Sequence, residues 1–274
     1  MTALQENSTA FNPNNLELTL IASYDRLIRA NITRVWENVL DWEHLPQLHG
    51  TSFGYVSLDE AGDWGWRTWS NPGRTAHIEL CVDKTQYVAR SYDANKQTSE
   101  IWTYLTPEDE QTGIHVEFHA TNIKPEAKDK VGKIYLRLYE QLWDEDEAMM
   151  MARQLRLTES RNKDTELNLG SSEQLRSRLP ITVQLKNSEF RLIELNGKLV
   201  LYSTICPHRL GPLIDADICD NSVTCPWHGY CFDINTGKCL SPAESSCKLP
   251  EPPTILEESG NIILRYQEFF NATS

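Results

Sequence analysis

The feature that most constrains this chain is a pair of short elements, Cys206-Pro-His208 and Cys225-Pro-Trp-His228, separated by a hairpin-sized segment. Each element carries one cysteine and one histidine at short spacing. Thiolates and imidazoles in such a set bind zinc or an iron–sulfur cluster. In a [2Fe–2S] cluster two thiolates would bind one iron and two imidazoles the other. The fold must therefore bring these two elements together.

The residues around the four ligands resemble the Rieske family, in the segments Cys206-Pro-His-Arg-Leu-Gly-Pro-Leu213 and Cys225-Pro-Trp-His-Gly-Tyr-Cys-Phe-Asp233. The resemblance implies a [2Fe–2S] cluster that transfers one electron at a time. Zinc is the alternative, but a zinc site would not need the glycine-bearing and proline-bearing loops. The cluster ligands implied by the resemblance are Cys206, His208, Cys225 and His228.

The flanking residues predict which kind of Rieske centre this is. High-potential members, in quinol-oxidising membrane complexes, have an extra cysteine in each loop, joined in a disulfide, and a serine after the second His-Gly. Here those positions are Pro212, Trp227 and Tyr230. Without that disulfide and that serine hydroxyl, fewer donors stabilise the reduced cluster. We expect a low-potential centre of the ferredoxin or oxygenase kind.

Length and charge limit the number of domains and the kinds of partner that this chain can have. A chain of 274 residues is long enough for a second domain beside a Rieske module. A net charge of −13 disfavours nucleic acid as a partner. No apolar run is long enough for a membrane span, and the polar start is not a signal peptide, so we expect a cytoplasmic protein. The five cysteines other than the two ligands are then expected to be reduced thiols, to which we assign no function.

Residues 16–158 predict one α+β domain. The segment 16–31 alternates apolar and polar residues like a strand, and the next residues repeat at helical spacing behind Thr33 as a candidate N-cap. Between 51 and 123 short strand-like runs alternate with turn residues, which predicts an antiparallel sheet. The stretch 127–157 predicts a long closing helix. The apolar residues that fall on or near one face of that helix are Ile134, Leu138, Leu142, Met149 and Leu155.

This order of elements resembles the helix-grip fold of the START/polyketide-cyclase superfamily, which encloses a cavity between sheet and helix. The first residues, 1–15, are polar and are expected to be flexible. Residues 159–179 are polar and without pattern, which predicts a linker. Residues 180–268 are expected to form the all-β Rieske domain. The chain as a whole is therefore expected to be α+β.

A second iron site is implied by the segment Asp41-Trp-Glu-His44-Leu-Pro-Gln-Leu-His49. It is similar to the Asp-x2-His-x4-His motif of Rieske non-haem iron oxygenases, in which the two histidines bind one Fe(II) and the catalytic domain has the helix-grip fold. In that family the aspartate lies on the electron route between the two metal centres, which is the role implied for Asp41.

The third ligand of such a site is an acid, because two histidines and one carboxylate leave the opposite positions of the iron free. The family takes it from the closing helix, and the segment 143–154 resembles the corresponding family segment. Asp146 is the first choice. The alternatives, in order, are Glu147, Glu145 and Asp144.

The resemblance implies an oxygenase with reversed domain order, since the usual order places the Rieske module first. Electrons from a partner flavin reductase or ferredoxin, together with O2, would oxidise a small aromatic or apolar substrate at Fe(II). The head-to-tail trimers of the family imply a homo-oligomer, with a trimer as the first expectation. The alternative is a non-catalytic Rieske electron carrier fused to a small-molecule-binding helix-grip domain, in which His44 and His49 are incidental.

Overall fold

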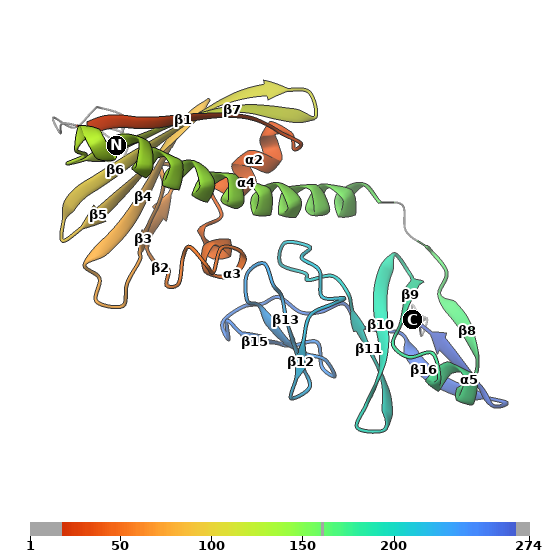
Figure 1. Ribbon diagram of the computed structural model, residues 1–274. Coiled ribbons are helices and arrows are strands. Elements are labelled where there is room, and N and C mark those ends of the chain that lie inside the picture. The colour runs from red at the N-terminus through yellow and green to blue at the C-terminus, as the bar shows by residue number, and fades with distance from the viewer. Residues whose placement is uncertain (1–17, 160–161, 267–274) are drawn as a thin grey trace, which may run out of the picture. The chain divides into compact units, whose positions relative to one another are not determined.

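The computed structural model describes residues 18–159 and 162–266, so the segment 1–15 that we expected to be flexible lies outside the described residues (Figure 1). The chain divides into two compact units between Gln154 and Leu155, and each is described by itself. Among the helices that the structure describes, none is both long enough and apolar enough to cross a bilayer.

The first unit is built on a seven-stranded antiparallel sheet with the order β1-β7-β6-β5-β4-β3-β2. The predicted run of antiparallel strands is confirmed, and the first strand pairs with the last. The strands are β1 (Leu18–Ile28), β2 (Ser57–Gly62), β3 (Gly65–Trp69), β4 (Ala76–Asp83), β5 (Gln86–Asp93), β6 (Lys96–Glu108) and β7 (Gln111–Thr121).

Between β1 and β2 the chain forms short helical elements, and after β7 it forms the long helix. These elements are α2 (Ile32–Val39), the 3-10 turn η2 (Trp42–His44), α3 (Leu45–Leu48), the 3-10 turn η3 (Pro125–Ala127) and α4 (Lys128–Thr158). The predicted N-cap was wrong: the main-chain N–H of Arg34 donates to Asn31 Oδ1 at 3.1 Å, so α2 starts before Thr33. Asn31 takes this place because its backbone is extended at the turn out of β1.

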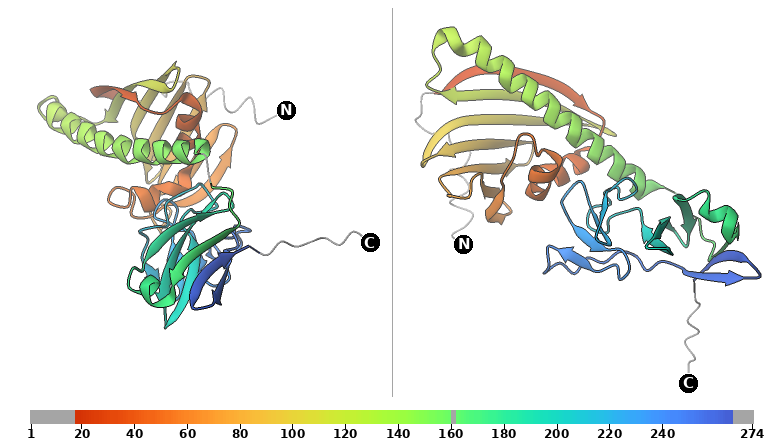
Figure 2. Two further views of the ribbon diagram at one scale, coloured as in Figure 1. Left: turned by 90° about the vertical axis from the view of Figure 1, so that its right-hand side faces the viewer. Right: turned by 60° about the horizontal axis from the view of Figure 1, so that its bottom comes forward.

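Helix α4 lies across one face of the sheet, and the core of this unit fills the space between them (Figures 1 and 2). Strand β7 shows the period that produces this core, because every second residue from Thr112 to Ala120 is buried. On the helix, Trp143 and Met150 are buried in the same cluster. The ring of Phe118 packs edge-on against Tyr139 at 4.8 Å between centroids.

The face of α4 that we expected to be buried was assigned correctly only in part. Met149 is 7% exposed, whereas Ile134 is 58% exposed and Leu155 is 66% exposed. The helix instead turns the side of Tyr139, Trp143 and Met150 toward the sheet. The predicted apolar residues and the buried ones both recur at helical spacing, so the sequence is compatible with either face of α4 being buried. The packing against β7 determines which face is buried in the structure.

Helix and sheet approach each other closely at Gly132. A Cβ at this position would lie 2.6 Å from the carbonyl oxygen of Ile21 in β1 and 3.3 Å from the Cβ of Ala22. No side chain fits at such a distance, so glycine allows the backbone of α4 to pass directly over β1.

The second unit consists of three small antiparallel sheets with the orders β11-β10-β9, β12-β13-β14-β15 and β16-β17-β8. The first strands are β8 (Glu166–Ser171), β9 (Ile181–Leu185), β10 (Ser188–Leu195) and β11 (Lys198–Ser203). The remaining strands are β12 (Ile218–Cys219), β13 (Ser222–Thr224), β14 (Cys231–Asp233), β15 (Cys239–Ser241), β16 (Thr254–Glu258) and β17 (Asn261–Arg265).

The segment 159–179, which we expected to be a linker, contains structure that belongs to this unit. Strand β8 pairs with β17, and helix α5 (Ser172–Arg176) follows it. Leu175 is fully buried in the core of the unit. The prediction failed because the apolar residues of β8 alternate with polar ones over only a few residues. Such a short strand forms only when it pairs with a partner, here β17, which lies far away in the sequence.

Candidate metal centres

Two histidines of the first unit are brought together by the short elements after α2. His44 ends η2, and His49 follows α3, whose first turn contains a proline. The main-chain N–H of His49 donates to the carbonyl of Leu45 at 3.2 Å, which closes the turn. The two imidazole centroids then lie 5.1 Å apart with the rings nearly perpendicular.

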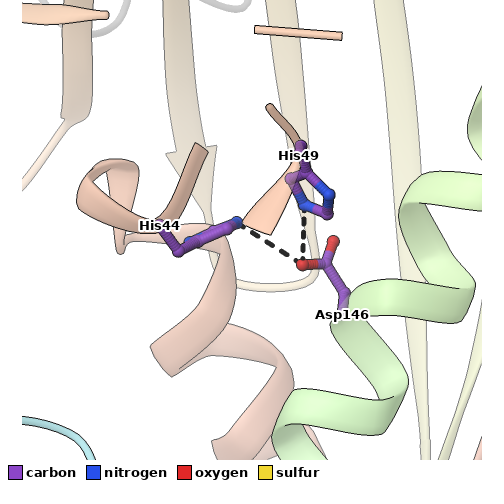
Figure 3. Close-up of side chains that lie close together, drawn as sticks. All are labelled: His44, His49 and Asp146. Atoms are coloured by element: carbon purple, nitrogen blue, oxygen red, sulfur yellow. Dashed lines mark hydrogen bonds and ion pairs between the residues drawn. The ribbon is translucent and has the colours of Figure 1, made fainter. Parts of the chain in front are cut away.

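Asp146 completes the cluster from α4 (Figure 3). Its Oδ1 lies 3.0 Å from His49 Nε2 and 3.4 Å from His44 Nε2. One candidate ligand atom from each of the three residues lies within 4.8 Å of the others. The side chains are 5% (His44), 2% (His49) and 13% (Asp146) exposed. Two nitrogens and one carboxylate oxygen therefore converge at a largely buried point.

The other acids considered for the third ligand point elsewhere. Glu147 is held by Arg26 and by Arg29, which donate to its carboxylate from the end of β1 and just beyond. Asp144 is 69% exposed and pairs with Arg26 at 2.7 Å. Neighbouring residues on a helix point about 100° apart, so only some of these acids can face the histidines.

Glu145 contacts the cluster from its outer side. Its Oε2 lies 2.6 Å from His49 Nδ1, so the imidazole of His49 lies between two carboxylates. Asn38 adds a further contact, because its Nδ2 donates to Asp146 Oδ1 at 3.0 Å. Sequence reasoning missed the contact of Glu145. The contact of Glu145 depends on His49 lying beside α4, and that of Asn38 on α2 lying beside α4, and no local sequence pattern predicts either arrangement.

The charges in the cluster favour an anionic Asp146. Burial alone would raise the pKa of Asp146, but the hydrogen bond from His49, the charges of His44 and His49 and the amide of Asn38 bring it below its usual value. For His49, burial alone would lower the pKa, whereas the two neighbouring carboxylates outweigh burial and raise it. The site thus holds a carboxylate that is ionised at neutral pH beside two nitrogen donors.

Asp41, the residue implied to lie on the electron route, is 8% exposed and stands between α2 and η2. Its main-chain N–H donates to the carbonyl of Asn38 at 3.0 Å, which continues the turn at the end of α2. Asp41 is thus a buried residue at the junction of α2 and η2, and its role on the electron route stays a prediction.

A partly open cavity of about 320 Å³ adjoins the cluster and lies between the sheet and α4. The three cluster residues line it together with mainly apolar and aromatic side chains such as Trp66 and Trp143. None of the described residues that line it is a lysine or an arginine. This cavity is large enough for a small organic molecule.

In the second unit, two loops carry the other ligand set. The loop after β11 is closed by the N–H of Cys206, which donates to the carbonyl of Gly211 at 2.8 Å. The loop after β13 is closed in the same way, by the N–H of Cys225 and the carbonyl of Tyr230 at 2.9 Å. His208 stacks on the ring of Tyr230, with centroids 4.1 Å apart.

The four predicted ligands of these loops lie together. The rings of His208 and His228 have centroids 4.7 Å apart. The thiol of Cys206 hydrogen bonds to Cys225 and lowers the pKa of Cys225 to about 5, while the same contact raises the pKa of Cys206. The two sulfurs therefore lie side by side, as two thiolates that bind one iron would.

The backbone around these sulfurs leaves no room for a side chain at Gly211. A Cβ at Gly211 would lie 2.6 Å from the sulfur of Cys225 and 3.1 Å from the ring of Trp227. Two buried sulfurs on one side and two imidazoles on the other fit a [2Fe–2S] cluster with mixed ligands.

Comparison with known proteins agrees with this chemistry. Residues 165–253 match the family model of the Rieske [2Fe-2S] domain. Apoptosis-inducing factor 3 of Mus musculus and of Homo sapiens is 36% identical over 63 residues, which is 19% of this chain and only 10% of each relative.

The similar solved structures cover the chain only in part. The ferredoxin of carbazole 1,9a-dioxygenase from Nocardioides aromaticivorans IC177 is 17% identical with a TM-score of 0.31, covering 38% of this chain and all of its own length. The Sphingomonas yanoikuyae B1 ferredoxin is 22% identical with a TM-score of 0.30, covering 37% and 99%. A conserved protein from Geobacillus kaustophilus is 15% identical with a TM-score of 0.35, covering 47% and 93%.

The matched segment begins at residue 165 and therefore includes β8 and α5, in agreement with the pairing of β8 with β17. It also contains the four cysteine and histidine ligands and both closed loops. The chain thus contains a Rieske [2Fe-2S] domain at residues 165–253.

Proposed function

We propose that this chain is a Rieske-type oxygenase with reversed domain order, whose first unit is a helix-grip catalytic domain of the START-like kind. The observation that carries the proposal is the convergence of His44, His49 and Asp146 beside a largely apolar cavity. This donor set is the 2-His-1-carboxylate set of non-haem Fe(II) oxygenases.

The residues of the cluster suit a mononuclear Fe(II). When bound, the iron would supply open coordination positions for O2 and the substrate. The ionised carboxylate of Asp146 would offset part of the positive charge, and Asn38 would hold that carboxylate in place. Glu145 would accept a hydrogen bond from the Nδ1–H of His49, which leaves Nε2 free of a proton to bind the iron. The apolar cavity walls would keep bulk water from the reacting substrate.

The Rieske domain would supply the electrons, after reduction by a separate flavin reductase or ferredoxin. Asp41 stays our prediction for the residue on the electron route to the mononuclear iron. A homo-oligomer, with a trimer as the first expectation, and a cytoplasmic location also stay predictions. The substrate would be a small aromatic or apolar molecule, in keeping with the residues that line the cavity.

Iron content provides the test. After reconstitution the wild-type chain should hold three irons, two in the cluster and one in the mononuclear site. The double variant His44→Ala, His49→Ala should hold two and keep the Rieske absorption and EPR spectra. A matched control is His115→Ala, His119→Ala, since these histidines lie on β7 and do not line the cavity. Two irons in both the wild type and the control would contradict the proposal.

A second candidate, a non-catalytic electron carrier with a small-molecule-binding domain, is favoured by one observation. Both ring nitrogens of His49 have a carboxylate partner, Glu145 at Nδ1 and Asp146 at Nε2, as in an ion-pair group that needs no metal. The carrier would bind ligand in the cavity with only two irons per chain. Consumption of O2 and formation of product in the presence of reductant would rule it out.

A further inference from the structure

The cavity of the first unit extends along the sheet away from the histidine cluster. On β5 its lining residues are Tyr87, Ala89 and Ser91, which all point to the same side of the sheet. Tyr87 marks the cluster end, because its ring lies 6.3 Å from that of Trp36 on α2, the helix whose Asn38 bonds Asp146. At about 3.3 Å per residue, Ser91 lies roughly 13 Å farther along the strand.

Two serines form a polar pair at this far end. Ser91 and Ser99 are direct cross-strand partners on β5 and β6, and both line the cavity. Ser99 is 3% exposed. Within the described residues, neither hydroxyl has a hydrogen-bond partner in the protein. A hydroxyl that lines a cavity and has no protein partner can both donate to and accept from a ligand, so this pair is suited to bind a polar group of a ligand.

The wall between the two ends is apolar and aromatic. Ala89 and its cross-strand partner Ile101 line the middle of the cavity, and the rings of Tyr139 and Trp143 face it from α4. Apart from the tyrosine hydroxyls, the titratable side chains of the described lining are His44, His49 and Asp146, all at the cluster end. A carboxylate or phosphate bound at the serine end would therefore lose its hydration without gaining a cationic partner there.

We infer that the cavity binds an elongated, uncharged, largely aromatic molecule with one hydrogen-bonding group at the end far from the cluster, where Ser91 and Ser99 bind it. The opposite end of the ligand then lies beside His44, His49 and Asp146. Only the designation of this ligand as a substrate rests on the proposed function; the binding itself does not.

Isothermal titration of the full chain, with its Rieske cluster loaded, tests the inference with three probes of one shape. The probes are 4-phenylphenol, 4-methylbiphenyl and biphenyl-4-carboxylate. One or two neutral hydrogen bonds should make the phenol bind about three- to tenfold more tightly than the methyl compound. The carboxylate should bind at least about tenfold more weakly than the phenol, because its charge has no cationic partner in the lining.

Variants locate the recognition. Ser91→Ala, Ser99→Ala should remove the advantage of the phenol and leave the affinity for 4-methylbiphenyl within about twofold. Ser57→Ala, on β2 and outside the cavity lining, should change neither affinity. The unfolding temperature of each variant shows whether it still folds. If the double variant does not fold, the single variant Ser99→Ala is used to measure the loss of ligand recognition.

Three results would overturn the inference: equal affinity of the phenol and the methyl compound for the wild type, tightest binding of the carboxylate, or no binding of any probe. Repeating the titration without and with added Fe(II) separates this inference from the proposed function. Selective binding in a chain that takes up only two irons would leave the inference standing and remove the oxygenase.

Discussion

Replacing Glu145 by glutamine tests whether the contact to His49 serves metal binding. The Oε2 of Glu145 lies 2.6 Å from His49 Nδ1, on the side of the ring opposite to the atom that faces Asp146. In Glu145→Gln a neutral amide replaces the carboxylate, so the Nδ1–H of His49 can at best donate to an uncharged oxygen, and the negative charge that raises the basicity of Nε2 is lost. Asp146, Asn38 and the cavity remain as they are.

The expected loss follows from the strength of such contacts. Removing a carboxylate that orients a metal-bound histidine costs about 10- to 100-fold in metal affinity, or roughly 1.4 to 2.7 kcal/mol. The side chain of Glu145 is 30% exposed, so water can replace part of the contact and the lower end of this range is expected.

The assay is Fe(II) binding by competition with a colorimetric chelator, with the Rieske spectrum recorded on the same samples. The matched control is Asp144→Asn, which makes the same change of charge one residue away on a side chain that is 69% exposed. Equal Fe(II) affinities for the two variants would refute the reasoning that Glu145 positions His49. A changed Rieske spectrum in Glu145→Gln would show a wider disturbance than the one proposed.

The remaining predictions concern packing, potential and pH. Gly132→Ala should lower the free energy of unfolding by about 1–3 kcal/mol, because its Cβ would lie 2.6 Å from the carbonyl of Ile21; Gly73→Ala, with nothing within 4 Å, is the control in thermal unfolding. A redox titration should place the Rieske midpoint between about −150 and 0 mV, and a clearly positive value would contradict the loop argument. Burial and the charge of Arg67 lower the pKa of His77, so the unfolded state binds the proton more readily and stability should fall as the pH drops below about 6.5. His77→Gln should flatten that slope in pH-dependent unfolding, and an unchanged slope would assign it to other groups.

Much of the fold could be predicted because its signals are local. Alternation of apolar residues indicated the strands of the first sheet, and helical spacing indicated α4. The face of α4 could not be predicted, since Ile134 and Trp143 both belong to apolar stripes and only packing against β7 distinguishes them. Strand β8 was missed because a short strand is stabilised by its partner, β17, and not by its own sequence.

The two candidate centres also differ in how far their residues could be predicted from local sequence signals. The Rieske ligands could be predicted from the sequence alone, because each loop carries its own cysteine and histidine within three residues and the glycines that the loop backbone requires. At the other centre the sequence presented four acids in a row, from Asp144 to Glu147. Only the tertiary structure decided that Asp146 faces both histidines, that Glu145 bonds the outer nitrogen of His49 and that Glu147 turns to the arginines of β1 and the residues after it. The rotation of α4 about its axis makes this choice, and that rotation is set by the side chains it buries against the sheet.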